Sequence, residues 1–171
     1  SAELMLSNIG FSSTPTSSEF NRTIFTDRNS LDAAITAWIA DETAATATYG
    51  DINTWDVRAI TDFSNLFQNK ATFNSDISNW DVSNGTDFSG MFDGANAFNQ
   101  DIDSWNVING TDFSGMFSGA SSFNQDIGNW NVSSGTDFYG MFEGANSFNQ
   151  DIGSWDVSSG TSFETMFAGA E

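Results

Sequence analysis

The chain has 171 residues, a formal net charge of −19 and only four basic residues, and it contains no cysteine and no histidine. Nucleic acids and anionic membranes are excluded as partners, because neutralising phosphates requires the lysines and arginines that this chain lacks. Without cysteine there are no disulfides and no thiol nucleophile, and without histidine the usual general base and the commonest transition-metal ligand are missing. Hydrophobic residues make up 39% of the chain, which suffices for the core of one domain.

Residues 1–28 are predicted to be a loop or edge segment. Serines and threonines cluster around the only proline, Pro15, but apolar residues such as Phe11 and Phe25 indicate that parts of the segment fold back over the first repeat. The start of the chain shows no signal-peptide pattern, and no apolar run reaches the ~18 residues of a spanning helix, so we expect no membrane insertion. We expect the chain to be a fragment of a longer protein.

Residues 29–50 are predicted to form a capping helix and a lead-in to the repeats. Asn29 or Ser30 is a candidate N-cap, and apolar residues follow at helical spacing: Leu31, Ala34, Ile35, Trp38 and Ile39. The helix is expected to cover about residues 30–41 and to shield the open end of the array with its apolar face.

Residues 51–171 repeat one phrase at a spacing of 25 residues, with copies that start at Asp51, Asp76, Asp101, Asp126 and Asp151. Such a period predicts an array in which each unit buries its apolar face only against its neighbours. We predict an α/β solenoid, a right-handed, leucine-rich-repeat-like stack of five rungs. Each rung is expected to have a short parallel strand at Phe-Asn-Gln-Asp-Ile and a short helical turn at Thr-Asp-Phe-Ser-Gly-Met-Phe.

Several columns of the repeat predict specific backbone or packing roles. The tryptophan column is expected to lie in the core, since its fixed spacing from isoleucine and valine favours packing over a sugar-binding platform. Asn69 stands where the other rungs have glycine, which predicts a left-handed residue, and the asparagines from Asn74 to Asn149 are expected to form a ladder. Four further glycines in register predict either a groove or a tightly turned backbone: Gly85, Gly110, Gly135 and Gly160.

The rungs resemble a known family of about 25-residue repeats. Trp80-Asp81-Val82-Ser83-Asn84, Thr86-Asp87-Phe88-Ser89-Gly90-Met91-Phe92 and Phe98-Asn99-Gln100-Asp101-Ile102 are similar to the BspA-like repeats of bacterial surface proteins. The resemblance covers residues 51–170. It implies an extracellular protein, secreted or on the bacterial cell surface, of the kind that includes adhesins. One departure is the glycine before Thr-Asp, where the family commonly has valine and only Ile60 keeps a branched residue.

Two sets of residues are candidate sites. Asp76, Asp101, Asp126 and Asp151 form a column whose carboxylates suit calcium, although aspartates before an apolar turn more often cap backbone amides. Calcium is therefore the weaker alternative, and no other cofactor is expected. Ile108 and Tyr139 break their polar columns in an apolar direction and are candidate ligand-binding anchors.

We expect a non-enzymatic recognition or adhesion module, because repeat arrays offer extended surfaces and this chain lacks catalytic residues. Its ligand would be a protein, a peptide or a glycan, and the module is expected to be a monomer. The alternative is a passive spacer in a surface protein. A polysaccharide hydrolase is a more distant alternative, since nothing singles out one acidic pair among equivalent copies.

Overall fold

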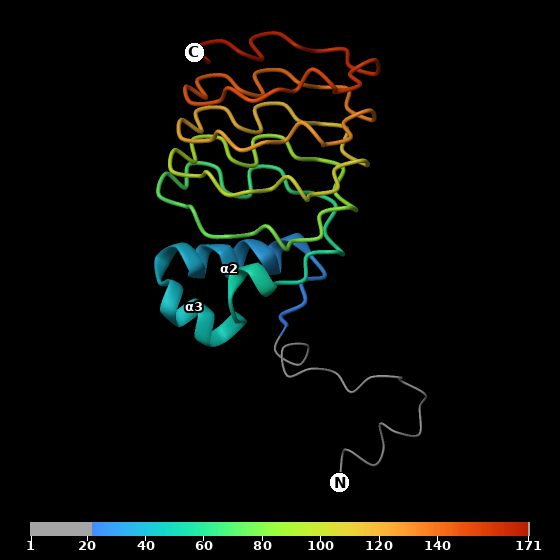
Figure 1. Cartoon of the computed structure of the whole chain (residues 1–171). Helices are drawn as coiled ribbons and strands as arrows, with labels where there is room; N and C mark the ends of the chain where they lie inside the picture. The colour runs from blue at the N-terminus through green and yellow to red at the C-terminus, as the bar shows by residue number, and fades with distance from the viewer. Residues whose placement is uncertain (1–21, 171) are drawn as a thin grey trace, which may run out of the picture.

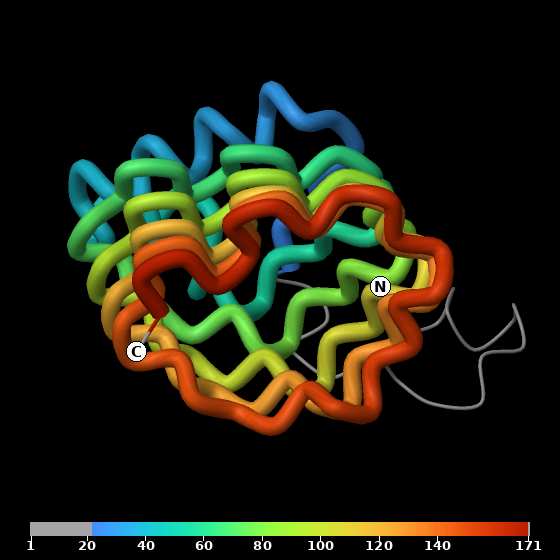
Figure 2. Tube along the Cα trace, turned by 90° about the horizontal axis from the view of Figure 1, so that it is seen from above, coloured from blue at the N-terminus to red at the C-terminus, as the bar shows by residue number. Residues whose placement is uncertain are grey.

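The protein folds into a stack of flat coils with two helices at one end (Figure 1). The structure is a computed structural model that describes residues 22–170. Helices α2 (Arg28–Ala40) and α3 (Glu42–Tyr49) come first, and the short 3-10 helix η1 (Ile52–Thr54) lies in the first coil. We number the coils one to five by their residues, which are 51–75, 76–100, 101–125, 126–150 and 151–170. Viewed along the stack, successive coils follow nearly the same path (Figure 2).

The prediction of an α/β solenoid with strand-plus-helix rungs is wrong, and so is its leucine-rich-repeat-like description. Residues 22–170 contain no strand, and the two α-helices precede the coils. Neighbouring coils are joined instead by isolated parallel bridges, which pair Asp62 with Asp87, Asp87 with Asp112, Asp112 with Asp137, and Asp137 with Ser162. These bridges lie where a helical turn was predicted, and the predicted strand segments, such as residues 98–102, have no regular structure.

The backbone forms neither a strand nor a helix because its amides alternate between two kinds of partner. In coil one, the amides of Phe63 and Asn65 donate to the carbonyls of Asp87 and Ser89 in coil two, both at 2.8 Å. The amide of Leu66 instead donates back to the carbonyl of Phe63 in its own coil, at 3.3 Å. A strand needs continuous pairing with a neighbour and a helix needs continuous local pairing, so this mixture excludes both.

Two columns of left-handed residues make this alternation possible. The first was predicted from the sequence and is confirmed, because φ is 58° at Asn69 and between 64° and 71° at Gly94, Gly119, Gly144 and Gly169. The second lies four residues earlier and was not predicted; it comprises Asn65, Gly90, Gly115, Gly140 and Thr165, with φ between 55° and 59°. Thr165 is β-branched and rarely adopts this conformation, so coil five carries backbone strain there.

The core consists of aromatic ladders that run along the stack. Phe117 shows the pattern, because its ring lies 5.6 Å from Phe92 in the coil before and 5.7 Å from Phe142 in the coil after, measured between ring centroids. The tryptophan column is buried, as predicted, with 1% of Trp55 and 3% of Trp130 exposed. From Trp80 onward each indole N–H donates to a carbonyl of the preceding coil.

The predicted asparagine ladder is also confirmed, and of the two alternatives for the four glycines in register, the tightly turned backbone is correct and the groove is not. The amides of Asn99, Asn124 and Asn149 each donate to the side-chain oxygen of the asparagine one coil earlier, at 2.9 Å. Gly85 is buried without a positive φ, and an added Cβ would lie 2.5 Å from Cζ of Phe88. A phenylalanine ring of the same coil therefore fills the space and leaves no groove. The amide of Gly85 donates to the carbonyl of Val82 at 2.8 Å, which closes a tight turn that recurs at Gly110, Gly135 and Gly160.

The helices lie at the coil-one end of the stack (Figure 1), and the first of them has other bounds than the predicted helix. Helix α2 begins at Arg28 because the N-cap is Asp27, whose carboxylate accepts a hydrogen bond from the Ser30 amide at 2.8 Å. Its buried residues are Leu31, Ala34, Ile35 and Trp38, which confirms four of the five residues of the predicted apolar face, whereas Ile39 is 37% exposed. Helix α3 was not predicted, since it buries only Ala45 and has no apolar stripe. Among the described residues, no helix has both the length and the apolar character to cross a membrane.

The segment before α2 pairs with the first coil, as expected for the end of the predicted edge segment. The amide of Phe25 donates to the carbonyl of Asp56 at 2.9 Å, and the amide of Asp56 donates to the carbonyl of Thr23 at 2.8 Å. Phe25 is buried beside Trp55, with ring centroids 5.1 Å apart. Residues 1–21, which make up the rest of that predicted segment, lie outside the described part of the chain.

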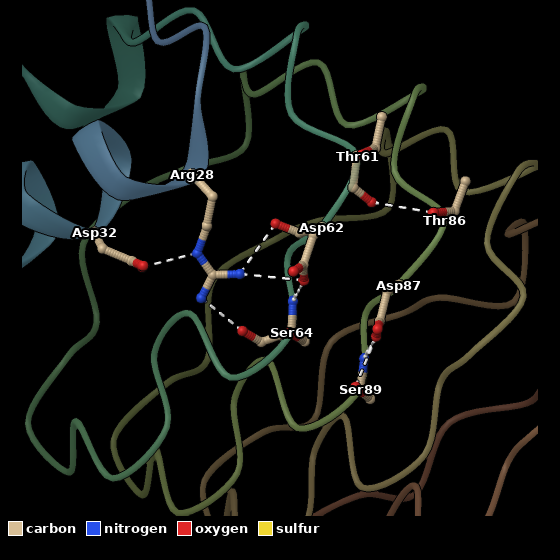
Figure 3. Close-up of polar contacts among 8 residues, drawn as sticks. All are labelled: Arg28, Asp32, Thr61, Asp62, Ser64, Thr86, Asp87 and Ser89. Carbon is tan, nitrogen blue, oxygen red and sulfur yellow. Dashed lines mark hydrogen bonds and ion pairs between the residues drawn. The ribbon is translucent and has the colours of Figure 1, made fainter.

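The side chain of Arg28 donates hydrogen bonds to coil one at the positions where a preceding coil would place its backbone amides (Figure 3). Its guanidinium donates to the carbonyl oxygens of Asp62 at 3.0 Å and Ser64 at 2.6 Å, while its Nε binds the carboxylate of Asp32 at 2.8 Å. In coil two the corresponding carbonyls, those of Asp87 and Ser89, accept backbone amides of coil one. One side chain thus replaces two backbone donors at the end of the stack.

Candidate functional site

The two candidate anchors, Ile108 and Tyr139, are both exposed but occupy different columns. Ile108 is 41% exposed and follows the tryptophan-valine part of coil three, where the other coils have arginine or serine. Tyr139 is 50% exposed and lies in the Thr-Asp-Phe part of coil four, where the other coils have serine or glutamate. The two residues therefore do not stack on one another.

The candidate calcium column has a backbone role in every coil. The carboxylates of Asp51, Asp76, Asp101, Asp126 and Asp151 each accept a hydrogen bond from the amide two residues later, at 2.8–3.0 Å. Such contacts close local turns and give each negative charge a backbone donor. Within residues 22–170 no three acidic side chains gather into a group that could hold a metal ion. The structure thus places these aspartates as turn-forming residues.

Asp56 is the one buried acidic residue among those described, and it lies where the N-terminal segment meets coil one. Its side chain is 3% exposed and contacts the guanidinium of Arg58 at 2.6 Å and that of Arg22 at 3.6 Å. The hydrogen bond from the Arg58 side chain lowers the pKa of Asp56, and although burial opposes this change, the backbone amide of Arg58 and the charge of Arg22 reinforce it. The carboxylate is therefore held in its charged form.

We expect the stabilisation from Asp56 to disappear in acid. A pKa lowered by folding means that the unfolded chain binds the proton first, so the contribution is complete above the unfolded pKa of about 3.9 and is lost as the pH falls through the lower folded value. Asp56→Asn should therefore be less stable than the wild type at pH 7, and the difference should shrink below about pH 4. Urea denaturation of the wild type and the variant between about pH 3 and pH 7 measures the stability difference and its decrease in acid.

Asp81 provides the matched control, because it occupies the same column in coil two but is exposed. Its carboxylate accepts the Ser83 amide at 3.1 Å, as the Asp56 carboxylate accepts the Arg58 amide. Asp81→Asn removes an exposed carboxylate of the same column that lacks the hydrogen-bonded arginine contacts of Asp56, so it should lower the unfolding free energy at pH 7 by less than Asp56→Asn does. Equal losses in the two variants would show that the arginine contacts of Asp56 contribute nothing.

A polar hollow of about 430 Å³ lies on coils four and five. It is lined by Gly128, Asn129, Trp130, Asn131, Ser133, Ser154 and Asp156, and we call this set the polar hollow. One lining residue, Gly128, stands where the first three coils have Asn53, Ser78 and Asp103, but a Cβ there would lie 2.6 Å from the carbonyl oxygen of Asp151, so coil five already fills the space beside it. Sequence reasoning missed the hollow.

Three side-chain atoms of the hollow have no hydrogen-bond partner within residues 22–170. They are the amide nitrogen of Asn131, the side-chain oxygen of Asn129 and the second carboxylate oxygen of Asp156. The remaining groups serve the fold, because Asn131 accepts the Ser133 amide and Asn129 donates to Asp103 at 3.1 Å. Hydrogen bonds from the hydroxyl and the amide of Ser158 lower the pKa of Asp156, so that carboxylate is charged at neutral pH. The hollow therefore offers both a donor and acceptors.

Comparison with protein families gives one match. The model of the family described as "Mycoplasma protein of unknown function, DUF285" matches residues 40–134 and again residues 111–171. The chain belongs to this family. No curated protein and no solved structure matched the sequence. The matched family is DUF285 and not the BspA-like repeat family, so the resemblance to BspA-like repeats stays a prediction.

In this DUF285 chain, Ile108 is the predicted anchor that the repeat places near the polar hollow. Ser133, which lines the hollow, stands one coil after Ile108 in the same column. Tyr139 is not among the lining residues. Hydrolysis of a glycosidic bond requires two carboxyl groups across the bond, and the lining of the hollow includes one, that of Asp156. The arrangement suits binding and lacks the acid pair of a glycosidase.

Proposed function

We propose that this DUF285 chain is a non-enzymatic recognition module of a bacterial surface protein and that its polar hollow binds a neutral, hydroxyl-rich ligand such as a glycan. The observation that carries the proposal is the hollow itself, in which a donor and two acceptors stand unpaired over the buried Trp130. The extracellular location rests on the resemblance of the repeats to those of bacterial surface proteins.

The chemistry of the hollow favours hydroxyl groups over charged ligands. A sugar hydroxyl both donates and accepts, so it can pair with the Asn131 amide nitrogen and with the oxygens of Asn129 and Asp156. Anionic ligands are disfavoured by the Asp156 carboxylate and by the net charge of −19. A volume of about 430 Å³ lies within the range of ligand pockets, roughly 300–1,000 Å³.

The contrast between core and surface also supports recognition. The apolar columns repeat with little change and are buried, whereas exposed columns vary from coil to coil, as where Arg58 and Ile108 replace serine. A constant core with a variable surface is the arrangement by which repeat proteins present binding sites. A passive spacer has no need of a hollow in only two of its coils, and it is the alternative that a binding measurement must exclude.

Binding to a glycan array should be weakened roughly tenfold or more by Asn131→Asp, because the variant loses the amide donor and brings a second carboxylate next to Asp156. The fold should tolerate this change, since Asp56, Asp81 and Asp156 occupy the same column in other coils. Affinities of the wild type and the variant for the glycans that bind best, measured by calorimetry, test the expectation.

Asn106→Asp is the matched control. Asn106 occupies the same column in coil three and accepts the Ile108 amide at 3.2 Å, as Asn131 accepts the Ser133 amide at 3.1 Å. The two variants therefore have the same net charge and the same turn, and only one changes the hollow. Equal affinities for both would place the binding site elsewhere, and a wild type that binds no glycan would favour the spacer or a peptide ligand.

A further inference from the structure

Asparagine is followed by glycine at two places in the chain, Asn84-Gly85 in coil two and Asn109-Gly110 in coil three. At the asparagine position, coil one has alanine and coils four and five have serine. An asparagine side chain can react with the backbone nitrogen of the next residue, and glycine hinders that nitrogen least because it has no Cβ. Coils two and three therefore each carry one pair of residues that is prone to this reaction.

In folded coil two, both reacting groups are bound to other partners. The amide of Gly85 donates to the carbonyl of Val82 at 2.8 Å, within the same turn. The side-chain nitrogen of Asn84 donates to the carbonyl of Arg58 in coil one at 2.7 Å. Asn84 is exposed, but Gly85 is buried. The glycine nitrogen can approach Cγ of the asparagine only after these hydrogen bonds have broken.

Coil three repeats this arrangement with the same distances. The amide of Gly110 donates to the carbonyl of Val107 at 2.8 Å, and the side-chain nitrogen of Asn109 donates to the carbonyl of Ser83 in coil two at 2.7 Å. The side-chain bond crosses from coil to coil in both cases, so separation of neighbouring coils breaks it. A coil without its neighbours also loses the packing that holds its own turn, because each repeat is stabilised by stacking.

We propose that Asn84 and Asn109 are sites of spontaneous deamidation, which the closed stack suppresses and the opening of coils two and three allows. The glycine nitrogen attacks Cγ of the asparagine and forms a new C–N bond. The bond from Cγ to Nδ2 breaks, and ammonia leaves with the proton that the glycine nitrogen gave up, so a cyclic succinimide remains. Water then adds to one of the two ring carbonyl carbons and opens the ring, which yields aspartate or isoaspartate.

Both products are incompatible with the native turn. Aspartate replaces the donor Nδ2 with a carboxylate oxygen, which would face the carbonyl of Arg58 or Ser83. Isoaspartate also lengthens the main chain by one methylene, and Gly85 has no room to move, since an added Cβ would lie 2.5 Å from Cζ of Phe88. The reaction therefore makes opening irreversible. This inference does not depend on the polar hollow or its ligand.

Ageing the chain at mildly alkaline pH, in buffer and in guanidinium chloride, tests the proposal. Peptide mass spectrometry that separates aspartate from isoaspartate follows Asn84 and Asn109. Both should convert in guanidinium chloride, and conversion in buffer should be slower by on the order of 100-fold or more, because it must wait for opening. Equal rates in the two solutions, or no conversion in guanidinium chloride, would show that the proposal is wrong.

Phe117→Ala tests whether the reaction passes through opening. Phe117 is fully buried in coil three, so its loss should speed conversion at Asn109 in buffer by roughly tenfold or more and leave the rate in guanidinium chloride unchanged. Phe167→Ala, in coil five, should change the rate at Asn109 much less. If the rate at Asn109 does not respond to Phe117→Ala, the reaction occurs in the closed turn and the proposal fails.

The double variant Asn84→Ser/Asn109→Ser is the control for irreversibility, because coils four and five have serine at this position. After ageing in guanidinium chloride and dilution into buffer, the wild type should regain little of its native tryptophan fluorescence, whereas the double variant should regain nearly all of it. Equal recovery of the two chains would contradict the proposed loss of the fold.

Discussion

Replacing Phe117 with alanine should lower the free energy of unfolding by about 3–5 kcal/mol. Its ring is fully buried in coil three and stacks on Phe92, Phe123 and Phe142, at centroid distances of 5.6, 4.1 and 5.7 Å. Because its neighbours are held by their own coils, the structure cannot collapse into the space, and the cost includes both lost burial and a cavity. Urea denaturation followed by tryptophan fluorescence measures the change.

Phe167→Ala is the matched control for this prediction. Phe167 belongs to the same column but is 49% exposed and stacks on one ladder neighbour, Phe142. Its replacement should cost about 1 kcal/mol, since less apolar area returns to water and no enclosed cavity forms. Similar losses for Phe117 and Phe167 would mean that stability comes from each coil alone and not from the ladders.

The sequence predicted the ladders because repetition alone determines them. A residue that recurs every 25 positions must lie above its own copy once the chain stacks at that period, whatever the local backbone does. The burial of the tryptophans, the Asn74 to Asn149 ladder and the left-handed Asn69 all follow from this reasoning, and each is confirmed.

The local backbone could not be predicted in the same way. The segment Phe-Asn-Gln-Asp-Ile carries strand-like residues, and Thr-Asp-Phe has a helix-capping pattern, so residue preferences favoured a strand and a helical turn. The deciding feature was a second left-handed column, that of Asn65 and Gly90, which divides the amides between local and inter-coil partners. Its residues change from asparagine to glycine to threonine, and Thr165 in particular gives no indication of a positive φ.

The candidate site could not be predicted from residue types. Asn129 and Asn131 line the polar hollow, but earlier coils carry the corresponding Asn79 and Asn106, so these side chains do not single out coil four. A search for distinctive side chains leads to Ile108 and Tyr139, which are exposed but do not line it. The sequence also gave no sign of the capping role of Arg28, because its partners Asp62 and Ser64 follow it by 34 and 36 positions.

Replacing Arg28 with alanine should lower the free energy of unfolding by about 2–3 kcal/mol, because the carbonyls of Asp62 and Ser64 would lose their donors at the end of the stack. Water can reach Asp62 more easily than the half-buried Ser64, so most of the loss is expected from the Ser64 contact of 2.6 Å. The N-terminus of α2 would also lose the ion pair between Arg28 and Asp32. Urea denaturation measures the total.

Two further variants separate the geometry of Arg28 from its charge. Arg28→Lys keeps the charge but cannot reach both carbonyls with a planar fork, so it should recover less than half of the lost stability. Lys70→Ala removes one positive charge from a chain of net charge −19 without touching the cap, and it should cost less than about 0.5 kcal/mol. If lysine restores full stability at position 28, the guanidinium acts only through its charge and does not substitute for the two amides of a preceding coil.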